Sequence, residues 1–261
     1  MRIAILYICT GQYSQFFQPF YESAETFFMK DQAEKHYFVF TDDRQLSQAA
    51  NVTLVYRECQ GFPLDSLFRF DMFLSIEEQL KAYDYCFFFN SNMKFLKPVG
   101  QEFLPEKEGL MAVLHSGYYR KPYWAYPYER SPKANAYIPP HDKPYHYFQG
   151  CLNGGKTELF LEFARTCSEE THEDYNKGII ALVHDESYLN KYMHYHPCVP
   201  MSPSYAYPEG KHLPVEPIIL QIDKRKVSTY FHNKGYSPSY WAKFKKGIRI
   251  FKNILRWYGK Y

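Results

Sequence analysis

Apolar positions near the start of the chain follow two patterns, continuous runs and helical spacing. Residues 3–9 form a short apolar run that Thr10 and Gly11 end, and residues 37–40 form a second run before a polar stretch. Such runs are typical of buried strands. Between them, residues 14–30 carry apolar positions at helical spacing. The order strand, helix, strand predicts an α/β fold with a largely parallel sheet.

The helical spacing returns at residues 64–82, and a third apolar run follows at residues 85–89. This run ends directly in Asn90-Ser91-Asn92. In open α/β sheets, ligands bind at the carboxyl ends of the strands. Because Asn is also a common turn residue, the pattern alone leaves a binding role and a turn role open.

The second half of the chain has a less regular pattern. Residues 115–147 are dense in Tyr and Pro, which indicates a long surface loop of the kind that carries binding. Gly154-Gly155 predicts a tight turn before a helix over residues 156–173. A further helix is expected to begin near His184, with acids in its first turn. Residues 220–222 are the last predicted strand.

Composition indicates a folded domain that is rich in aromatic side chains. The chain has 261 residues, of which 46% are hydrophobic and 20% aromatic, so it can bury a full core. Aromatic faces with hydroxyl tips suit stacking on sugars and nucleobases, although aromatics also fill ordinary cores. The composition therefore favours sugar or nucleotide binding without proving it.

The cysteines and the start of the chain bear on the compartment. The six cysteines include no Cys-x-x-Cys pair and none of the spacings of zinc sites, which indicates free thiols in a reducing compartment. The apolar run behind Met1 and Arg2 is too short for a secretory signal, and no stretch reaches transmembrane length. We therefore expect a cytoplasmic protein.

Charge is unevenly distributed along the chain. Residues 240–261 hold seven Lys or Arg and no Asp or Glu, so with a net charge of +3 the rest of the chain carries −4. Apolar residues of this tail recur at intervals of three and four, at Trp241, Phe244, Ile248, Phe251, Leu255 and Tyr258. Such a helix is suited to lie in an anionic membrane interface. Docking onto the domain is the alternative, and the acidic body argues against a nucleic-acid partner.

Three stretches together resemble a known family. They are Asn90-Ser91-Asn92 behind its strand, residues 146–155 (HYFQGCLNGG) and residues 184–192 (HDESYLNKY), the last being the most specific. With weaker likenesses in the same order over about residues 1–226, the chain resembles glycosyltransferase family 6, which makes the histo-blood-group A and B antigens and the α-1,3-galactosyl epitope. The resemblance implies a GT-A fold, a single Rossmann-like α/β domain with a mixed central sheet.

The family arrangement also implies a division of the chain. We expect a glycosyltransferase domain over residues 1–230, in which about residues 1–95 bind UDP and residues 96–230 bind the acceptor. Residues 231–261 are then a basic amphipathic tail with a C-terminal helix, outside the resemblance.

The strand-end motif departs from the family pattern. The family has Asp-x-Asp, whose carboxylates hold a manganese ion on the diphosphate of UDP, whereas this chain has Asn90 and Asn92. A neutral amide oxygen is a weaker ligand for a hard dication than a carboxylate. Bacterial members share this departure, so we expect both Asn at the donor of an enzyme that needs no metal or other cofactor. Arg69 and Lys224 are the expected cations on the departing diphosphate.

The resemblance assigns further residues to the UDP-sugar donor. The positions that align with family contacts to uridine are Ile8, Thr10 and Tyr13. Gln149, Gly150 and Cys151 match the stretch that selects the donor sugar, where a glycine at the third position leaves room for an acetamido group. Because Cys151 is larger than glycine, we expect UDP-galactose, with UDP-GalNAc as the alternative.

Glu186 is the residue expected to carry catalysis. Retention of the α-configuration needs a carboxylate beside the anomeric carbon, as a nucleophile or as support for front-side substitution. By resemblance, Asp185 holds hydroxyls of the donor sugar and His184 lies near donor and acceptor. His115, Val183 and Glu186 are expected at the acceptor, and Val183 stands where the family has Trp.

These expectations combine into one function with two alternatives. We expect a retaining α-1,3-galactosyltransferase that acts on a galactoside or fucosyl-galactoside of a bacterial surface glycan, at the inner face of the cytoplasmic membrane. N-acetylgalactosaminyl transfer is the alternative within the enzyme class. A glycan-binding protein without turnover is the alternative outside it, because loss of Asp-x-Asp is also what a decayed enzyme shows.

Overall fold

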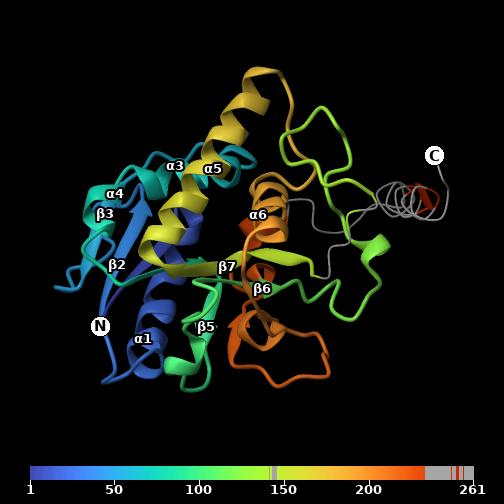
Figure 1. The fold of residues 1–261 in the computed structure, drawn as a ribbon. Helices are drawn as coiled ribbons and strands as arrows, with labels where there is room; N and C mark the ends of the chain where they lie inside the picture. The colour runs from blue at the N-terminus through green and yellow to red at the C-terminus, as the bar shows by residue number, and fades with distance from the viewer. Residues whose placement is uncertain (141, 143–145, 233–247, 249–250, 253–254, 256–261) are drawn as a thin grey trace.

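The computed structural model describes residues 1–140, 142, 146–232, 248, 251–252 and 255. In this part of the chain the strands are β1 (Arg2–Ile8), β2 (Glu34–Thr41), β3 (Val52–Tyr56), β4 (Tyr85–Asn90), β5 (Met93–Phe95), β6 (Leu110–Leu114), β7 (Phe148–Lys156), β8 (Val199–Met201), β9 (Tyr207–Pro208) and β10 (Ile219–Gln221). The α-helices are α1 (Phe17–Phe27), α2 (Leu64–Leu67), α3 (Arg69–Leu74), α4 (Glu77–Leu80), α5 (Thr157–Asn176) and α6 (Asp185–Tyr195) (Figure 1).

The central sheet has seven strands in the order β3-β2-β1-β4-β7-β6-β8. The first four are parallel, β7 is antiparallel to both β4 and β6, and β8 is parallel to β6. The expected mixed α/β sheet is therefore confirmed. Because β7 is reversed, its first residues lie at the same edge of the sheet as the last residues of β1 and β4. A second sheet has the order β5-β10-β9.

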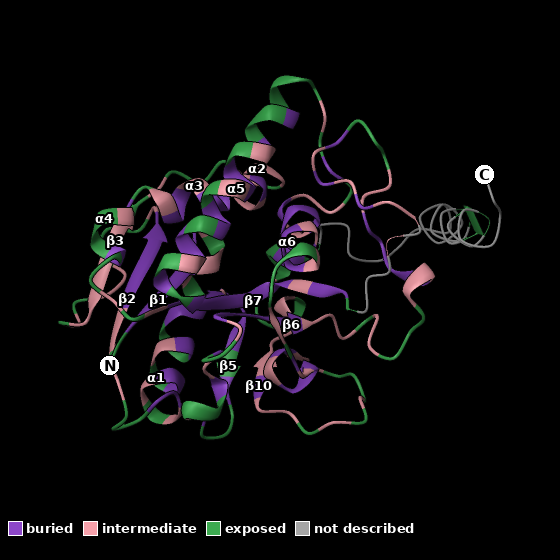
Figure 2. Ribbon diagram, in the orientation of Figure 1, coloured by how far each residue is buried: buried purple, intermediate pink, exposed green. Residues whose placement is uncertain are grey.

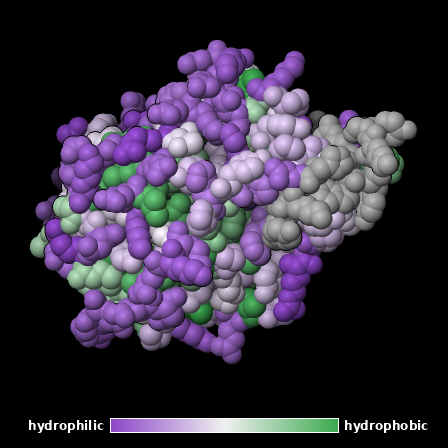
Figure 3. All heavy atoms as spheres, in the orientation of Figure 1, coloured by the Kyte–Doolittle hydropathy of each residue, from purple (hydrophilic) through white to green (hydrophobic). Residues whose placement is uncertain are grey.

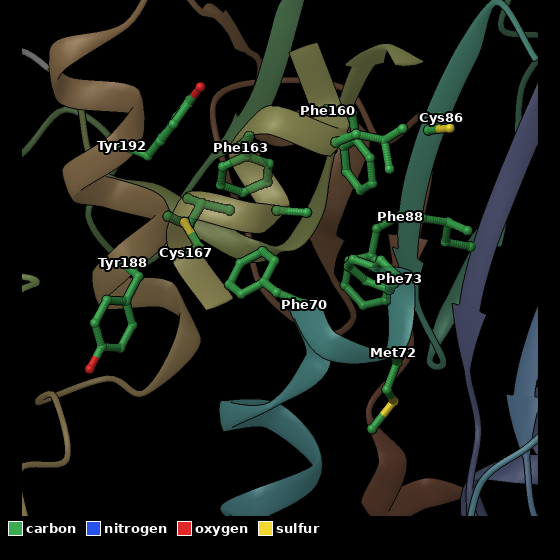
Figure 4. Close-up of a cluster of buried hydrophobic side chains, with 14 of the residues drawn as sticks. Phe70, Met72, Phe73, Cys86, Phe88, Phe160, Phe163, Cys167, Tyr188 and Tyr192 are labelled. Atoms are coloured by element: carbon green, nitrogen blue, oxygen red, sulfur yellow. The ribbon is translucent and has the colours of Figure 1, made fainter. Parts of the chain in front are cut away.

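Both faces of the central sheet are covered, as its buried strands in Figure 2 show. On one face, Ala4 and Leu6 of β1 belong to a cluster with side chains of α3, α5 and α6; Figure 4 shows the phenylalanines of this cluster packed between the helices and β4. On the other face, Tyr7 packs against Phe17 and Phe20 of α1, with ring centroids 5.5 and 4.5 Å away. Burial on both faces explains why these strands have continuous apolar runs.

The single helix predicted over residues 64–82 is wrong. The chain forms the three short helices α2, α3 and α4 there, because Phe68 and Ile76 leave helical geometry with ψ angles of 26° and 22°. The turns allow Leu67, Phe70 and Leu80 to bury their side chains in the same cluster against the sheet. Apolar spacing showed which residues are buried but not where the helix breaks.

The tight turn predicted at Gly154-Gly155 is also wrong, since both residues lie inside β7. Their small size serves strand packing instead. A Cβ on Gly154 would come within 2.3 Å of the backbone oxygen of Cys86 in β4, and one on Gly155 within 2.1 Å of the backbone oxygen of Gly109. Only glycine allows the neighbouring chains to approach this closely.

The described residues of the stretch 115–147, namely 115–140, 142 and 146–147, form the irregular loop that the sequence predicts, and we call this stretch the tyrosine-rich loop. The regular structure in its described part is a short 3₁₀ helix at Tyr123–Ala125. In Figure 1 the loop, green to yellow-green, lies on the side of the molecule away from β2 and β3. Tyr126, Tyr128, Ile138 and Tyr147 form a separate buried cluster within it.

The predicted C-terminal helix falls mostly outside the described residues. Its four described positions, Ile248, Phe251, Lys252 and Leu255, are helical and exposed. Among the described residues, none of the helices is both long enough and apolar enough to span a bilayer. The face of the molecule in Figure 3 is largely hydrophilic, with small hydrophobic patches.

Candidate active site

A cavity of about 890 Å³ opens where β1 and β4 end and β7 begins. Most of the residues singled out from the sequence line it together: Arg69, Asn90, Asn92, Gln149, Gly150, Cys151, Val183, His184, Asp185, Glu186 and Lys224. They come from five separated stretches of the chain. This is the edge of an α/β sheet at which ligands collect.

Glu186 is fixed in the cavity wall by two hydrogen bonds. The hydroxyl of Tyr147 donates to its Oε1 at 2.5 Å, and the backbone N–H of Gly150 donates to its Oε2 at 2.8 Å. Both carboxylate oxygens therefore have a defined position. Glu186 lies in the first turn of α6, where the helix dipole favours a negative charge.

The start of α6 is held against β7 by Asn190. Its side-chain oxygen accepts from the N–H of Phe148 at 2.8 Å, and its Nδ2 donates to the carbonyl of the same residue at 2.9 Å. The two bonds extend the strand's backbone pairing to a side chain of the helix. They fix the height of Glu186, one turn earlier, relative to Gly150.

Asp185 forms a buried ion pair with Arg69. The guanidinium Nη2 lies 3.0 Å from Asp185 Oδ2, and Nη1 donates to the carbonyl oxygen of Gly150 at 2.5 Å. A Cβ on Gly150 would lie 3.1 Å from Asp185 Oδ2, so glycine leaves the room that this pair needs. Arg69 lines the cavity, but its charge is shared with Asp185.

Burial shapes the electrostatics of these acids. Burial and, to a smaller extent, the neighbouring Glu186 raise the pKa of Asp185 to about 7, although the Arg69 charge acts in the opposite direction. Burial also raises the pKa of Glu186, opposed by its hydrogen bonds from Tyr147 and Gly150. Burial lowers the pKa of His184. Burial therefore favours the protonated form of both acids relative to their exposed counterparts.

Asn90 and Asn92 do not form a site that fits manganese. Asn92 Nδ2 donates to the carbonyl oxygen of Ile222 at 2.7 Å, and its Oδ1 accepts from Asn90 Nδ2 at 2.9 Å. The Asn92 amide is therefore engaged within the protein, which leaves Asn90 Oδ1 as a single neutral oxygen. In the described part of the chain, no three His, Cys, Asp or Glu side chains are grouped so that they could hold a metal ion.

The Asn92 contact places a basic cluster beside the cavity. Ile222 also donates its N–H to the backbone oxygen of Asn92 at 2.7 Å, and the 3₁₀ helix Lys224–Lys226 begins two residues later. Lys224 and Arg225 line the cavity. Lys224 Nζ lies 4.6 Å from the ring centre of Tyr13, and Arg225 pairs with Asp223 at 2.6 Å. Basic side chains from the segment after β10 thus line the cavity.

Four expected site residues are not among the residues that line the cavity. Ile8 ends β1 in register with Asn90, and buried Thr10 donates to Asp65 Oδ2 at 3.4 Å. Tyr13 borders the cavity through Lys224. His115 lies behind Tyr147, at 5.7 Å between ring centres. The first three lie beside the strand ends. His115 is separated from Glu186 by Tyr147, which contacts both.

The sequence reasoning gave no role to Tyr147, Phe62 or Asp223. Tyr147 belongs to the 146–155 stretch, but nothing in the spacing shows that its hydroxyl reaches a carboxylate 39 residues away. Phe62 lines the cavity with its ring 4.9 Å from that of His184, although its side chain is largely exposed. The sequence signal that could have pointed to Phe62 is an aromatic residue between Gly61 and Pro63, which is typical of an exposed loop.

Comparison with known proteins identifies the family. The model of glycosyltransferase family 6 matches residues 1–232. O-antigen biosynthesis glycosyltransferase WbnI from Escherichia coli is 38% identical over 88% of this chain and 98% of its own length. The rat histo-blood group ABO system transferase 1 (34% identical) and the mouse globoside alpha-1,3-N-acetylgalactosaminyltransferase 1 (30%) match 78% and 82% of this chain, which spans 60% and 63% of their lengths. The chain is therefore a hexosyltransferase that belongs to glycosyltransferase family 6.

Proposed function

We propose that the protein is a metal-independent, retaining α-1,3-galactosyltransferase that moves galactose from UDP-galactose to a galactoside or fucosyl-galactoside of a bacterial surface glycan. The observation that carries the proposal is the fixed carboxylate of Glu186 in the cavity wall, beside the sugar-selecting stretch that begins β7. A carboxylate so held serves either route to retention, attack on the anomeric carbon or support of front-side substitution.

Two neighbouring groups are proposed to hold the sugar. Asp185, paired with Arg69, presents a carboxylate in the first turn of α6 that accepts from sugar hydroxyls. His184, whose pKa is lowered by burial, is a neutral ring at neutral pH and lies between this acid and Val183 on the acceptor side. Uridine is proposed to lie along Ile8, Thr10 and Tyr13, at the strand ends.

The leaving diphosphate is proposed to be neutralised by protein cations. Lys224, Arg225 and Arg69 line the cavity, and the charges of the two arginines are partly offset by Asp223 and Asp185. Charge-assisted hydrogen bonds from such groups stabilise developing negative charge without a metal. Asn90 and Asn92 then shape the site and connect it to the basic cluster.

A chelator and one variant test the metal proposal. We expect full turnover in EDTA, and no gain from manganese. In Asn92→Asp, a carboxylate would face the carbonyl oxygen of Ile222 and lose the donated hydrogen bond, so KM for the donor should rise ~5-fold. Loss of turnover in EDTA, or activation of the variant by manganese above wild type, would contradict the proposal.

N-acetylgalactosaminyl transfer is the second candidate, because the mouse relative carries that activity in its name. Cys151 favours galactose, since its buried side chain occupies the position where a glycine would leave room for an acetamido group. One or two atoms in a pocket discriminate by only ~1–3 kcal/mol. Comparison of kcat/KM for UDP-galactose and UDP-GalNAc decides between them, and a preference for UDP-GalNAc would overturn the first choice.

Two observations support the proposed acceptor and location: the basic tail, and the E. coli relative, whose name refers to O-antigen biosynthesis. We propose that residues 240–261 bind an anionic membrane surface from the cytoplasmic side. Ile248, Phe251 and Leu255 are exposed at one helical spacing, and the tail holds seven basic residues. The full chain should float with phosphatidylglycerol vesicles and not with phosphatidylcholine vesicles, and Phe251→Asp should weaken this binding. Equal flotation with both lipids would contradict it.

A further inference from the structure

Glu129 joins the tyrosine-rich loop to the segment in front of α6. Its Oε1 accepts from the backbone N–H of Ser131 at 2.7 Å, and its Oε2 accepts from the backbone N–H of Leu182 at 2.8 Å. The first bond shapes a local turn. The second connects residues that are 53 positions apart, so one carboxylate links two separate parts of the chain.

The segment that Glu129 holds is a wall of the cavity. Leu182 and Val183 line the cavity directly before His184. Burial fixes this segment at Ala181 alone, which belongs to the main hydrophobic cluster, whereas its neighbours Ile180 and Leu182 are 49% and 43% exposed. The positions of Leu182 and Val183 therefore depend on hydrogen bonds to their backbone N–H groups.

Two side chains supply these hydrogen bonds in succession. Glu129 accepts from the N–H of Leu182, and Ser187 Oγ accepts from the N–H of Val183 at 3.0 Å. The next residue, His184, has a φ of 50°. A non-glycine residue keeps a left-handed conformation only where its surroundings hold it there. The two bonds provide that support immediately before the residue that needs it.

The residue beside Glu129 supports the tyrosine that binds Glu186. The hydroxyl of Tyr128 donates to the backbone oxygen of His146, and its ring lies 5.3 Å from that of Tyr147, which binds Glu186. Adjacent residues of one loop thus support Glu186 through Tyr147 and Leu182 through Glu129.

We infer that Glu129 is a positioning residue for sugar transfer, which sets the acceptor side of the cavity by holding the main chain at Leu182. The inference rests on the proposed function, in which Val183 and His184 meet the acceptor. Without this bond, the wall between acceptor and donor moves while the strand ends that bind UDP stay in place. Acceptor binding should suffer, and water should compete better for the activated sugar.

Two variants and one matched control test the inference. The side chain in Glu129→Asp is one methylene shorter. It can still accept from the N–H of Ser131, but it no longer reaches the N–H of Leu182. Glu129→Gln keeps the length but has one acceptor oxygen for two N–H groups. The control is Glu102→Asp, since Glu102 Oε1 also accepts a backbone N–H two residues away, that of Gly100 at 2.8 Å. Glu102 is exposed, in a short 3₁₀ helix outside the residues that line the cavity.

In Glu129→Asp we expect KM for the galactoside to rise at least ~5-fold, as loss of a charged hydrogen bond allows, with KM for the donor within ~2-fold of wild type. The share of UDP-sugar lost to hydrolysis should rise, and Glu129→Gln should lie between this variant and wild type. A merely structural role would lower the melting temperature and leave the ratio of the two KM values unchanged, and that result would overturn the inference.

Hydrogen exchange measures the contact without any substrate. The peptide that covers residues 180–184 should exchange faster in Glu129→Asp and at the wild-type rate in Glu102→Asp. Unchanged exchange in Glu129→Asp would also overturn the inference. If wild-type enzyme transfers no galactose or N-acetylgalactosamine to a galactoside, the proposed function fails, while the exchange rates still decide whether Glu129 holds this wall.

Discussion

The sheet edge at the cavity and the tyrosine-rich loop hold their side chains in place by different means. At the edge, Asn90 is positioned by the pairing of β4 with β1, and Gly150 lies in β7 two residues before the pairing of that strand with β4 begins. The strands are buried on both faces. In the loop, carboxylates replace regular pairing. Asp174 accepts from the N–H of Asn135 at 2.8 Å and from the hydroxyl of Tyr188 at 2.9 Å.

The difference teaches where each half of the site tolerates change. A buried sheet resists a change in volume, because neighbouring backbones have no room to move. A loop held by a few acceptor groups tolerates added volume but not the loss of one acceptor, because few other contacts replace it. Substitutions at the edge should therefore act on folding, and substitutions in the loop should act on turnover.

The largest expected effect is on the sheet. In Gly154→Ala the new methyl group would lie 2.3 Å from the Cys86 backbone oxygen, and we expect a loss of at least ~3 kcal/mol in the free energy of unfolding. The loop control is Gly117→Ala, whose methyl group would lie 3.0 Å from the side chain of His115 and not against backbone. Urea unfolding should show a change below ~1 kcal/mol for this control. Equal urea midpoints for Gly154→Ala and Gly117→Ala would contradict the difference between the sheet and the loop.

Glu186→Gln tests the residue at which the two regions meet. We expect turnover to fall at least ~100-fold while UDP binding is retained, because the amide loses the charge but keeps the size. Steady-state turnover and titration calorimetry with UDP measure the two quantities. Glu158→Gln, in the exposed first turn of α5, is the control and should be near wild type. Near-normal turnover of Glu186→Gln would refute its assigned role.

Tyr147→Phe removes the loop's hydrogen bond to Glu186 and leaves the ring in its aromatic cluster. Hydrogen bonds to charged groups contribute ~1.5–3 kcal/mol, so kcat should fall ~10-fold or more. The melting temperature should change little, because the buried area is retained. A large loss of stability with unchanged kcat would contradict this prediction, because it would mean that the loop, like the sheet, affects folding and not turnover.

The pH profile gives the smallest effect. Asp185, with a pKa raised to about 7, gains a proton below that pH and loses its ion pair with Arg69. We expect kcat/KM for the donor to fall several-fold as the pH drops from about 8 to about 6. For stability the sign is opposite: the contribution of the protonated carboxyl is full below about pH 4 and is lost as the pH rises toward 7. A flat profile would contradict the shift.

The sequence was most informative where apolar residues are continuous. The runs at residues 3–9 and 85–89 are β1 and β4, and the acids at the start of α6 followed from the match around His184. Gly154-Gly155 was misread because glycine serves both turns and close strand packing, and only the neighbouring strand distinguishes them. The breaks between α2, α3 and α4 depend on the shape of the sheet they cover, which local spacing does not contain.

The site was predicted unevenly for the same reason. Asn90 was predicted from its place at the end of a strand and Glu186 from the motif around His184, and both line the cavity. Each has a signal in the residues next to it in the sequence. The bond from Tyr147 to Glu186 and that from Glu129 to Leu182 join distant positions through an irregular loop, whose path no residue pattern encodes. The hydrogen bond from Asn92 to the carbonyl oxygen of Ile222 could not be predicted either, because every residue has such a backbone group.

The reversed direction of β7 has a consequence for enzyme engineering. Gly150 uses both of its backbone groups near the start of that strand, donating to Glu186 and accepting from Arg69. A chimera that borrows the preceding loop from a relative must therefore join no later than residue 146 and keep the register of β7. A graft that is one residue too long would exchange the inward and outward sides of the strand and misplace both bonds, even if every sugar-contacting residue were copied correctly.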